Sequence, residues 1–284
     1  MIRNSHAKIN LSLEILKKRD DDYHNITSIF QLLELHDEIE IIFDDCEKEI
    51  EIISDAPIPL DENNSCFKAV QIYKDNYFLP DNVKIIITKK IPVCAGLGGG
   101  SSNAATVLSM LIENYQTRIS ENKLLNLGLQ IGADVPFFLK HTNTAHVGGI
   151  GDEIFPIKSL SDIPILLVVP NFGTSTKDAY DKADSCNLDN IGDKTTLLKQ
   201  AIQMGFFREA TRYMYNDFEK CLFPGNSKLP EIKSEIDSTS PIKSLLTGTG
   251  SVLYALYEND IQLENAYIKL SSKYNTIKSC FKKT

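Results

Sequence analysis

The sequence predicts a fold of mixed helices and strands in two domains, and three observations support this prediction. The chain has 284 residues, which is enough for one large domain or two ordinary ones. Strand and helix patterns alternate over the first half of the chain. A polar, proline-containing stretch at 155–164 then precedes a second set of strands and helices. We therefore expect an N-terminal domain at 1–158 and a C-terminal domain at 159–284.

The composition is that of a globular protein and limits the classes of function. Hydrophobic residues make up 42% and charged residues 24% of the chain, close to globular averages. The net charge of −8 argues against nucleic acid as a partner, because binding its phosphates requires a basic face. The six cysteines include no C-x-x-C pair, which argues against a zinc site and is typical of a reduced, intracellular protein. No apolar run is long enough for a signal peptide or a membrane span, so we expect a cytoplasmic protein with no membrane partner.

In the first half, alternating apolar residues predict strands, and apolar residues at helical spacing predict helices. Strands are expected at 7–16, 38–43 and 83–88, with a further apolar stretch at 26–35. Helices are expected at 61–77, 102–115 and 120–132. Asn63 or Asn64 is placed to cap the first helix and Ser120 the third, because each side chain can accept a hydrogen bond from an unpaired backbone N–H.

The second half begins with a buried strand that ends at Pro170. The polar stretch at 174–193 predicts a surface loop or a short helix. The remaining elements are expected as helices at 195–215, 229–237 and 262–273, and as strands at 244–247 and 252–257 on either side of a glycine-containing turn.

A glycine-rich turn lies between the strand at 83–88 and the helix at 102–115. Its residues are Pro92, Val93, Cys94, Ala95, Gly96, Leu97, Gly98, Gly99, Gly100, Ser101 and Ser102. Glycines let backbone N–H groups converge on one point, and the helix that follows directs its unpaired N–H groups and positive dipole end at the same point. The arrangement therefore predicts a phosphate site.

Two familiar phosphate loops are excluded. The P-loop requires a lysine after its last glycine, and none follows here; the dinucleotide pattern G-x-G-x-x-G would end on Ser101 or Asn103. A flexible linker is the plain alternative, but a linker is not expected between a hydrophobic strand and an alanine-rich helix.

Lys8 and Asp134 are the candidate catalytic residues. Phosphoryl transfer needs positioned phosphates, neutralised charge and an oriented nucleophile, and a lysine with an aspartate can supply the last two. Lys8 lies between apolar residues at the start of a strand, and Asp134 lies between a helix end and an apolar segment. Each has an ordinary alternative: Lys8 could be solvated at a strand edge, and Asp134 could be a turn-forming residue.

Five segments closely resemble, in order and spacing, the GHMP kinase superfamily of galacto-, homoserine, mevalonate and phosphomevalonate kinases. They are Ala7-Lys8-Ile9-Asn10-Leu11, Asp21-Asp22-Tyr23-His24, the glycine turn through Asn103, Gly132-Ala133-Asp134-Val135-Pro136-Phe137 and Leu246-Thr247-Gly248-Thr249-Gly250. G-L-G-G-G-S-S-N-A-A is specific for the superfamily. A-K-I-N-L, Y-H and G-A-D-V-P-F-F resemble the branch whose substrate is a sugar alcohol linked to cytidine diphosphate. The resemblance is nearly continuous in the N-terminal half and patchy in the C-terminal half.

This resemblance implies an α+β fold with a ribosomal protein S5 domain 2-like N-terminal domain and a ferredoxin-like C-terminal domain. It implies an ATP-dependent kinase that phosphorylates the C2 hydroxyl of a cytidyl substrate in non-mevalonate isoprenoid synthesis. Asp134 would accept the hydroxyl proton, and Lys8 would hold Asp134 ionised, orient the hydroxyl and offset negative charge. The glycine turn would hold the ATP phosphates together with Mg²⁺, for which Ser101 or Ser102 is the nearest hydroxyl.

The resemblance also implies a cytosine site. Tyr23 and His24 match the family's base-binding pair, in which an aromatic ring stacks on the base and a histidine binds its edge. Tyr180 is expected to supply a second ring. The alternatives are a half-buried strand aromatic for Tyr23 and a solvated loop imidazole for His24.

Further contacts follow from the same resemblance. Asn10 is expected to face the hydroxyls of the acceptor, and Asn64 and Lys89 are expected to approach adenine, although Asn64 has the competing N-cap role. The family's third motif would be a supporting turn for the phosphate loop, made here by Thr247, Gly248, Thr249 and Gly250.

One position departs from the family pattern, and two other interpretations stay open. Asp22 stands where the family usually has glycine, which puts the local loop geometry in question, although Asp tolerates left-handed backbone. The chain could instead be a GHMP kinase for mevalonate or homoserine, but such acceptors carry no base that would need stacked rings. It could also be a catalytically silent ATP-binding regulator, which would have no chemical need for both Lys8 and Asp134.

Overall fold

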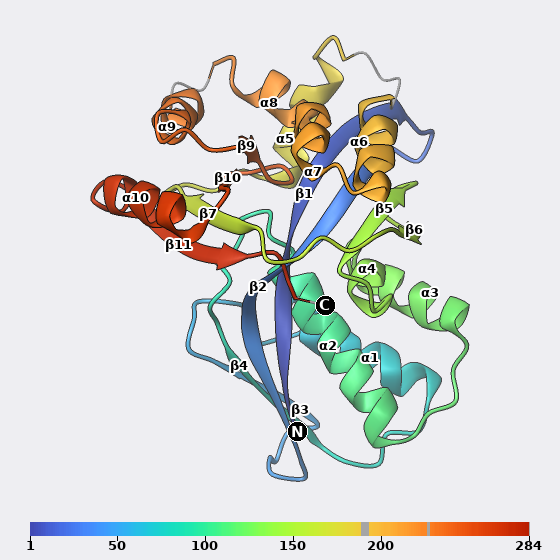
Figure 1. Ribbon diagram of the computed structural model, residues 1–284. Helices are drawn as coiled ribbons and strands as arrows, with labels where there is room; N and C mark the ends of the chain where they lie inside the picture. The colour runs from blue at the N-terminus through green and yellow to red at the C-terminus, as the bar shows by residue number, and fades with distance from the viewer. Residues whose placement is uncertain (189–192, 226–227, 284) are drawn as a thin grey trace. The chain divides into compact units, whose positions relative to one another are not determined.

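The computed structural model describes residues 1–188, 193–225 and 228–283, and its ribbon is shown in Figure 1. The chain divides into two compact units. Unit 1 comprises 1–7, 35–93 and 98–142, and unit 2 comprises 8–34, 94–97 and 143–284. Two long strands, β1 (Ile2–Lys18) and β2 (His24–Phe43), contribute residues to both units. The predicted mixture of helices and strands is confirmed.

Unit 1 places helices against a small sheet. Strand β4 (Val83–Thr88) pairs in parallel with β3 (Ile50–Ser54) and antiparallel with residues 38–43 of β2. The helices are α1 (Ser65–Asn76), α2 (Gly99–Asn114), α3 (Glu121–Ile131) and α4 (Val135–Leu139). Asn64 and Ser120 cap α1 and α3 as predicted, through side-chain oxygens that accept from Cys66 N–H and Lys123 N–H.

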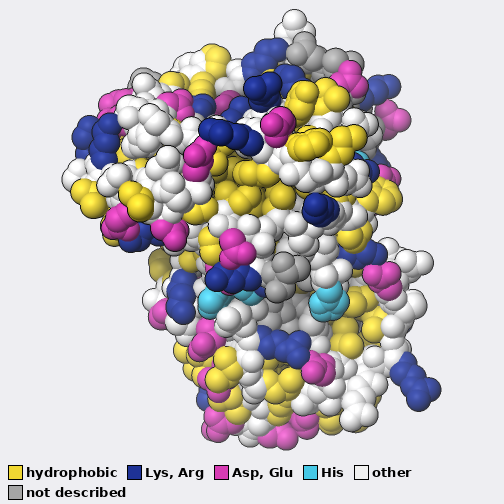
Figure 2. Space-filling view, viewed as in Figure 1, with side chains coloured by type: hydrophobic (Ala, Val, Ile, Leu, Met, Phe, Trp, Pro, Cys, Tyr) yellow, Lys and Arg dark blue, Asp and Glu magenta, His cyan; other side chains and the backbone are white. Residues whose placement is uncertain are grey.

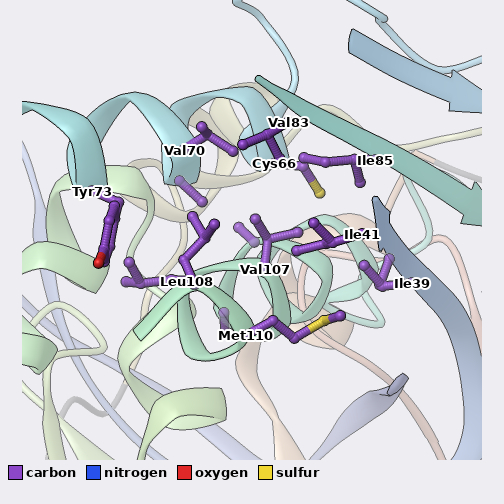
Figure 3. Close-up of a cluster of buried hydrophobic side chains, with 14 of the residues drawn as sticks. Ile39, Ile41, Cys66, Val70, Tyr73, Val83, Ile85, Val107, Leu108 and Met110 are labelled. Carbon is purple, nitrogen blue, oxygen red and sulfur yellow. The ribbon is translucent and has the colours of Figure 1, made fainter. Parts of the chain in front are cut away.

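The core of unit 1 lies between this sheet and helices α1 and α2 (Figure 3). Alternate strand residues point into it, so Ile39, Ile41, Val83 and Ile85 are buried on one side of the sheet. Helices α1 and α2 contribute buried residues at helical spacing to the same core, among them Val70, Tyr73, Val107, Leu108 and Met110. Full burial of each large aliphatic side chain contributes about 1.5–3 kcal/mol. This packing fixes the end of β4 and the start of α2, between which the glycine turn runs.

Unit 2 contains a four-stranded antiparallel sheet in the order β11-β7-β10-β9. Its strands are β7 (Pro164–Val169), β9 (Lys243–Leu246), β10 (Leu253–Leu256) and β11 (Asn275–Cys280). Helix α10 (Asp260–Ser271) connects β10 to β11. The segment between β7 and β9 holds α5 (Thr176–Asp184), α6 (Asp193–Met204), α7 (Phe207–Ala210), a 3₁₀ turn (Thr211–Tyr213), α8 (Asp217–Leu222) and α9 (Lys228–Asp237). The strand order is that of a ferredoxin-like sheet, as the resemblance implied.

The rest of unit 2 is formed around the unit 2 portions of β1 and β2. Residues 28–31 of β2 pair antiparallel with β5 (Thr144–Gly148), which pairs with β6 (Glu153–Pro156). The short strand β8 (Tyr215–Asn216) pairs in parallel with Ser12 and Leu13 of β1. Leu13, Ile15, Leu166 and Phe218 belong to the apolar core of this unit.

Some predicted elements differ from the structure. The stretches 26–35 and 38–43 form one strand. The polar stretch at 174–193 contains the short helix α5, one of the two forms expected there. The single helix expected at 195–215 is wrong, because α6 ends before Gly205, whose φ of +83° is left-handed. Strand β11 was not predicted, since its sequence NTIKSC alternates only weakly.

The surface shows no unusual separation of charge on the face drawn in Figure 2, where Lys and Arg side chains lie among Asp and Glu side chains. Of the helices in the described ranges, none has the length and apolar character that crossing a membrane would demand.

Candidate active site

The glycine turn uses left-handed backbone at alternate positions. Cys94, Gly96 and Gly98 have φ of 54°, 72° and 69°. Residues other than glycine rarely adopt this left-handed region of backbone conformation. Gly98 occupies the N-cap position of α2 and provides no side-chain hydrogen bond to the helix. The first N–H groups of α2 are therefore uncapped by a side chain at this position, as an anion site at a helix N-terminus requires.

The segment that carries Asp134 passes beside this end of α2 within unit 1. A Cβ atom added to Gly132 would lie 3.9 Å from Ser101 Oγ. Asp134 follows at the N-cap position of α4, but its side chain makes no capping hydrogen bond to that helix. Capping therefore does not explain why an aspartate stands here. Since Lys8 belongs to unit 2, the pairing of Asp134 with Lys8 stays a prediction.

Lys8 is buried in unit 2, so its alternative as a solvated strand-edge residue is wrong. Only 4% of the residue is exposed. Its Nζ donates a hydrogen bond to Asn10 Oδ1 over 3.1 Å and lies 4.1 Å from the centroid of the Phe30 ring. Its backbone N–H donates to the carbonyl of Leu97 in the glycine turn over 2.9 Å. A buried ammonium needs such partners, which also fix its direction.

Asn10 connects Lys8 to the supporting turn. Besides the Lys8 ammonium, Asn10 Oδ1 accepts from the Gly248 N–H over 3.0 Å. Asn10 Nδ2 donates to Ser28 Oγ over 3.0 Å, and Asn10 O accepts from the Tyr254 hydroxyl over 2.9 Å. The residue is 1% exposed. The structure therefore gives Asn10 the task of holding Lys8, and the expected contact with acceptor hydroxyls stays a prediction.

The supporting turn packs directly onto the glycine turn inside unit 2. Thr247 Oγ1 donates to Gly96 O over 3.5 Å, and a Cβ on Gly96 would lie 2.6 Å from Thr247 O and 3.2 Å from Gly250 O. A side chain at position 96 would have to displace backbone atoms. Glycine is therefore required at this position both by its φ and by the space available.

His24 is held by residues of α5 in unit 2. Its Nε2 lies 2.6 Å from Asp184 Oδ1, and its ring stacks on Tyr180 with centroids 5.0 Å apart. Asp184 also accepts from Lys18 Nζ over 2.7 Å. Chiefly because of the Lys18 hydrogen bond, and then because of His24, the pKa of the Asp184 carboxyl lies below its usual value. The His24 side chain is 7% exposed, so its alternative as a solvated loop imidazole is wrong.

The tyrosine beside this histidine stands in solvent. Tyr23 is 59% exposed, unlike a half-buried strand aromatic. The preceding Asp22 has a φ of +66°, so it adopts the left-handed backbone that the family's glycine would favour. The departure at Asp22 thus preserves a glycine-like turn. The contacts of Tyr23 and Tyr180 with a base stay predictions.

The two residues expected near adenine have structural partners in unit 1. Asn64 Oδ1 accepts from the Cys66 N–H over 2.8 Å and Asn64 Nδ2 donates to Pro59 O over 2.6 Å, which confirms its N-cap role. Lys89 Nζ forms an ion pair with the buried carboxylate of Asp37. Contacts of Asn64 and Lys89 with ATP stay predictions.

The serine hydroxyls differ in their surroundings. Ser102 is buried, and its Oγ accepts a hydrogen bond from Ser5 Oγ over 2.7 Å, whereas Ser101 is half-buried. Within the described ranges, no group of three His, Cys, Asp or Glu side chains could hold a metal ion. A Mg²⁺ ion would therefore depend on phosphate oxygens, water and at most a serine hydroxyl, which fits the way this ion is usually bound with nucleotides.

Three functional candidates escaped the sequence analysis. Asp37 and Asn103 form a buried network at the base of the glycine turn, and Asp184 orients His24. Asp184 was detectable as an acid four positions after Tyr180 on one helix face. Asp37 was detectable only as a break in the alternation of β2.

The chain is similar to known kinases in sequence and in fold. Residues 64–141 match the profile of the family described as GHMP kinases N terminal domain. A 4-diphosphocytidyl-2-C-methyl-D-erythritol kinase of Clostridium botulinum (strain Kyoto / Type A2) is 36% identical over 283 residues, covering 98% of each chain. One of Clostridium novyi (strain NT) is 34% identical over 277 residues, again covering 98% of each chain.

Solved structures show the same fold. A crystal structure of 4-(cytidine 5'-diphospho)-2C-methyl-D-erythritol kinase superimposes with a TM-score of 0.82 at 25% identity, covering 100% of both chains. A homoserine kinase from Cytophaga hutchinsonii reaches a TM-score of 0.75 at 14% identity, covering 99% of this chain and 93% of that one, which shows the fold alone. The full-length identity to the clostridial kinases places the chain more narrowly than the fold does. The chain belongs to the 4-diphosphocytidyl-2-C-methyl-D-erythritol kinase family of the GHMP kinases.

Proposed function

We propose that this chain transfers the γ-phosphoryl group of ATP to the C2 hydroxyl of 4-diphosphocytidyl-2-C-methyl-D-erythritol, a step of non-mevalonate isoprenoid synthesis. The observation that carries the proposal is 36% identity, over 98% of both chains, to a kinase named for this substrate. The buried Lys8, held by Asn10, and the left-handed glycine turn support it independently. The reaction takes place in the cytoplasm.

In this proposal, Asp134 accepts the proton of the C2 hydroxyl as the oxygen attacks the γ-phosphorus, and the bond from the γ-phosphorus to the bridging oxygen of ADP breaks. Lys8 stabilises the negative charge near the reacting oxygen. Asn10 Oδ1 accepts a hydrogen bond from the Lys8 ammonium and so keeps that positive charge in one place. A fixed charge in a dry site stabilises a transition state more than a mobile one, because no reorganisation is needed.

The glycine turn at residues 92–102, called the phosphate turn from here on, binds the triphosphate through backbone N–H groups. Positive φ at Cys94, Gly96 and Gly98 suits a nest of N–H groups, and α2 adds its N-terminal N–H groups. Bound Mg²⁺ supplies further neutralisation of the β- and γ-phosphates, with the Ser101 or Ser102 hydroxyl as the protein group nearest to it. Asn64 and Lys89 lie toward adenine.

The cytidine end of the substrate binds at Tyr23 and His24. The exposed Tyr23 ring offers a stacking surface, and Tyr180 stands next to His24. Asp184 holds His24 Nε2, so the ring presents its other nitrogen to the edge of the base. Asn10 lies toward the acceptor hydroxyls, and Thr247 to Gly250 support the phosphate turn. Along the sequence, we propose domain bounds of 1–158 and 159–284 for this kinase.

Release of ADP by the purified chain with Mg-ATP tests this function. The acceptors are 4-diphosphocytidyl-2-C-methyl-D-erythritol, mevalonate and homoserine, each at matched concentration, with an acceptor-free reaction as control. We expect turnover with the cytidyl substrate alone. Turnover with mevalonate or homoserine but not with the cytidyl substrate would contradict the proposed acceptor. ATP binding without turnover on any of the three acceptors would favour a catalytically silent regulator.

A further inference from the structure

Asp37 is a buried carboxylate that the proposed chemistry does not use. It is 0% exposed and lies in β2, where the apolar alternation is interrupted. One oxygen, Oδ1, accepts from the backbone N–H groups of Lys90 and Ile91, both over 2.8 Å. The other, Oδ2, accepts from Asn103 Nδ2 over 2.9 Å and pairs with the Lys89 ammonium. Such a group is tolerated in a core only when it is so completely bonded.

The partners of Asp37 bracket the phosphate turn. Lys90 and Ile91 immediately precede Pro92, and Asn103 immediately follows Ser102. One carboxylate therefore holds the segment where the chain enters the turn and, through Asn103, the second turn of α2. All of these groups belong to unit 1.

The same network reaches the last hydroxyl of the turn. Asn103 Nδ2 also donates to Ser5 Oγ over 2.9 Å, and Ser5 Oγ donates to Ser102 Oγ over 2.7 Å. Because a carboxylate only accepts, Asp37 obliges Asn103 to present its NH₂ group, and this sets the direction of the bond from Asn103 to Ser5. Ser102 Oγ then accepts from the Ser5 hydroxyl at the end of the network.

We propose that Asp37 is a positioning residue for ATP, acting as a clamp that ties the two ends of the phosphate turn together through Lys90, Ile91 and Asn103. The proposal rests on the proposed function, because it assumes that the turn binds ATP. It differs from a merely structural role in one respect: loss of the clamp weakens ATP binding while the acceptor site keeps its affinity.

Asp37→Asn is the primary test. The new amide can still accept from Lys90 and Ile91, but its NH₂ group faces the donors of Lys89 and Asn103. Without the clamp, ATP binding itself must restore the geometry of the turn, so we expect the Kd of the Mg²⁺ complex of a non-hydrolysable ATP analogue, measured by calorimetry, to rise by at least about 5-fold. The upper bound is about 150-fold, which corresponds to the full cost of one unsatisfied buried group. The KM for the cytidyl substrate at saturating ATP should stay within about twofold of the unmodified chain.

The reciprocal pair Asp37→Asn with Asn103→Asp restores the clamp. The new carboxylate at 103 accepts from the new amide at 37 and pairs with Lys89, whose Nζ lies 3.5 Å from Asn103 Oδ1. Ser5 can rotate its hydroxyl to donate to that carboxylate. We expect the double variant to recover most of the lost affinity for the ATP analogue.

Two further variants keep the test decisive. Asn103→Ala removes only the far end of the clamp and should raise the same Kd about tenfold, even if Asp37→Asn does not fold. Asp217→Asn alters another buried carboxylate, whose Oδ2 accepts from the Ile15 N–H over 2.7 Å, and should leave ATP affinity unchanged.

Two results would overturn the clamp. One is unchanged affinity for the ATP analogue in folded Asp37→Asn and in Asn103→Ala. The other is a folded double variant that binds the analogue no better than Asp37→Asn. Because calorimetry needs no turnover, these results are separable from a failure of the proposed reaction, which the unmodified chain would reveal by releasing no ADP.

Discussion

Replacing Gly96 with alanine tests whether the phosphate turn depends on close packing against the supporting turn. At φ +72° an alanine costs roughly 1–2 kcal/mol in backbone strain. Its Cβ would lie 2.6 Å from Thr247 O, a backbone atom that cannot rotate away, and relief of such overpacking costs about 1–3 kcal/mol more. Loss of chain entropy in the unfolded state offsets about 0.4–1 kcal/mol. The net destabilisation is therefore about 1–5 kcal/mol.

Gly225→Ala is the matched control. Gly225 has a similar φ of +81°, but among the described residues none beyond its chain neighbours lies within 4 Å of the added Cβ, so this variant has the backbone strain without the close contact. We expect a loss of about 1.5 kcal/mol or less for Gly225→Ala. Calorimetric melting should show a fall in Tm of about 2–8 °C for Gly96→Ala and of at most about 3 °C for the control. Only Gly96→Ala should also raise the KM for ATP. Equal falls in Tm and an unchanged KM for ATP would refute the inferred contact.

Three other predictions concern the chemistry and the cytidine end. Asp134→Asn should bind ATP normally and lose about 10²- to 10⁴-fold in kcat, since it removes the proposed base; near-normal turnover in the ADP assay would exclude that role. Tyr23→Ala should raise the KM for the cytidyl substrate far more than the KM for ATP, and equal changes would move Tyr23 out of the base site. Asp184 has a pKa lowered below its ordinary 3.8, chiefly by Lys18, so its stabilising contribution is fully present above that pH and is lost as pH falls through the lower folded value. The Tm difference between the unmodified chain and Asp184→Asn should accordingly be constant from pH 7 to pH 5 and disappear in stronger acid.

Much of the fold could be predicted from local sequence patterns, because a strand or a helix cap depends mainly on residues that are close together in the sequence. The strand at 83–88 and the helix cap at Ser120 follow from alternation and from one side-chain hydrogen bond, and both were found. Helix α6 ends where Gly205 adopts left-handed backbone, and a glycine at such a position is a signal in the sequence for the end of a helix. Strand β2 was divided into two because Asp37 looks like a loop residue until its four buried donors are known.

The site was less predictable, since its partners are remote in sequence. Lys8 was selected by its place between apolar residues and Asn10 by resemblance. Nothing in the neighbouring residues indicates that the amide oxygen of Asn10 accepts from the Lys8 ammonium and from the Gly248 N–H at once. His24 likewise gave no sign of Asp184, which lies 160 positions away. Such bonds depend on tertiary packing, which a single sequence does not display.

The division of β1 and β2 between the two units has a consequence for how the chain is made. Unit 1 is complete once residue 142 has been synthesised. Residues 8–34 of unit 2 are made early; their two strand portions can pair with each other, but they must wait for their partners from the rest of unit 2. Strand β5 begins only at Thr144, and the Gly248 N–H that bonds Asn10 arrives 238 positions after it. Until then the apolar faces of both strands lack these neighbours, and pairing across such separations is slow and exposed to aggregation. We therefore expect refolding of the full chain, followed by amide hydrogen exchange, to protect residues 38–43 of β2 before residues 28–31 of the same strand.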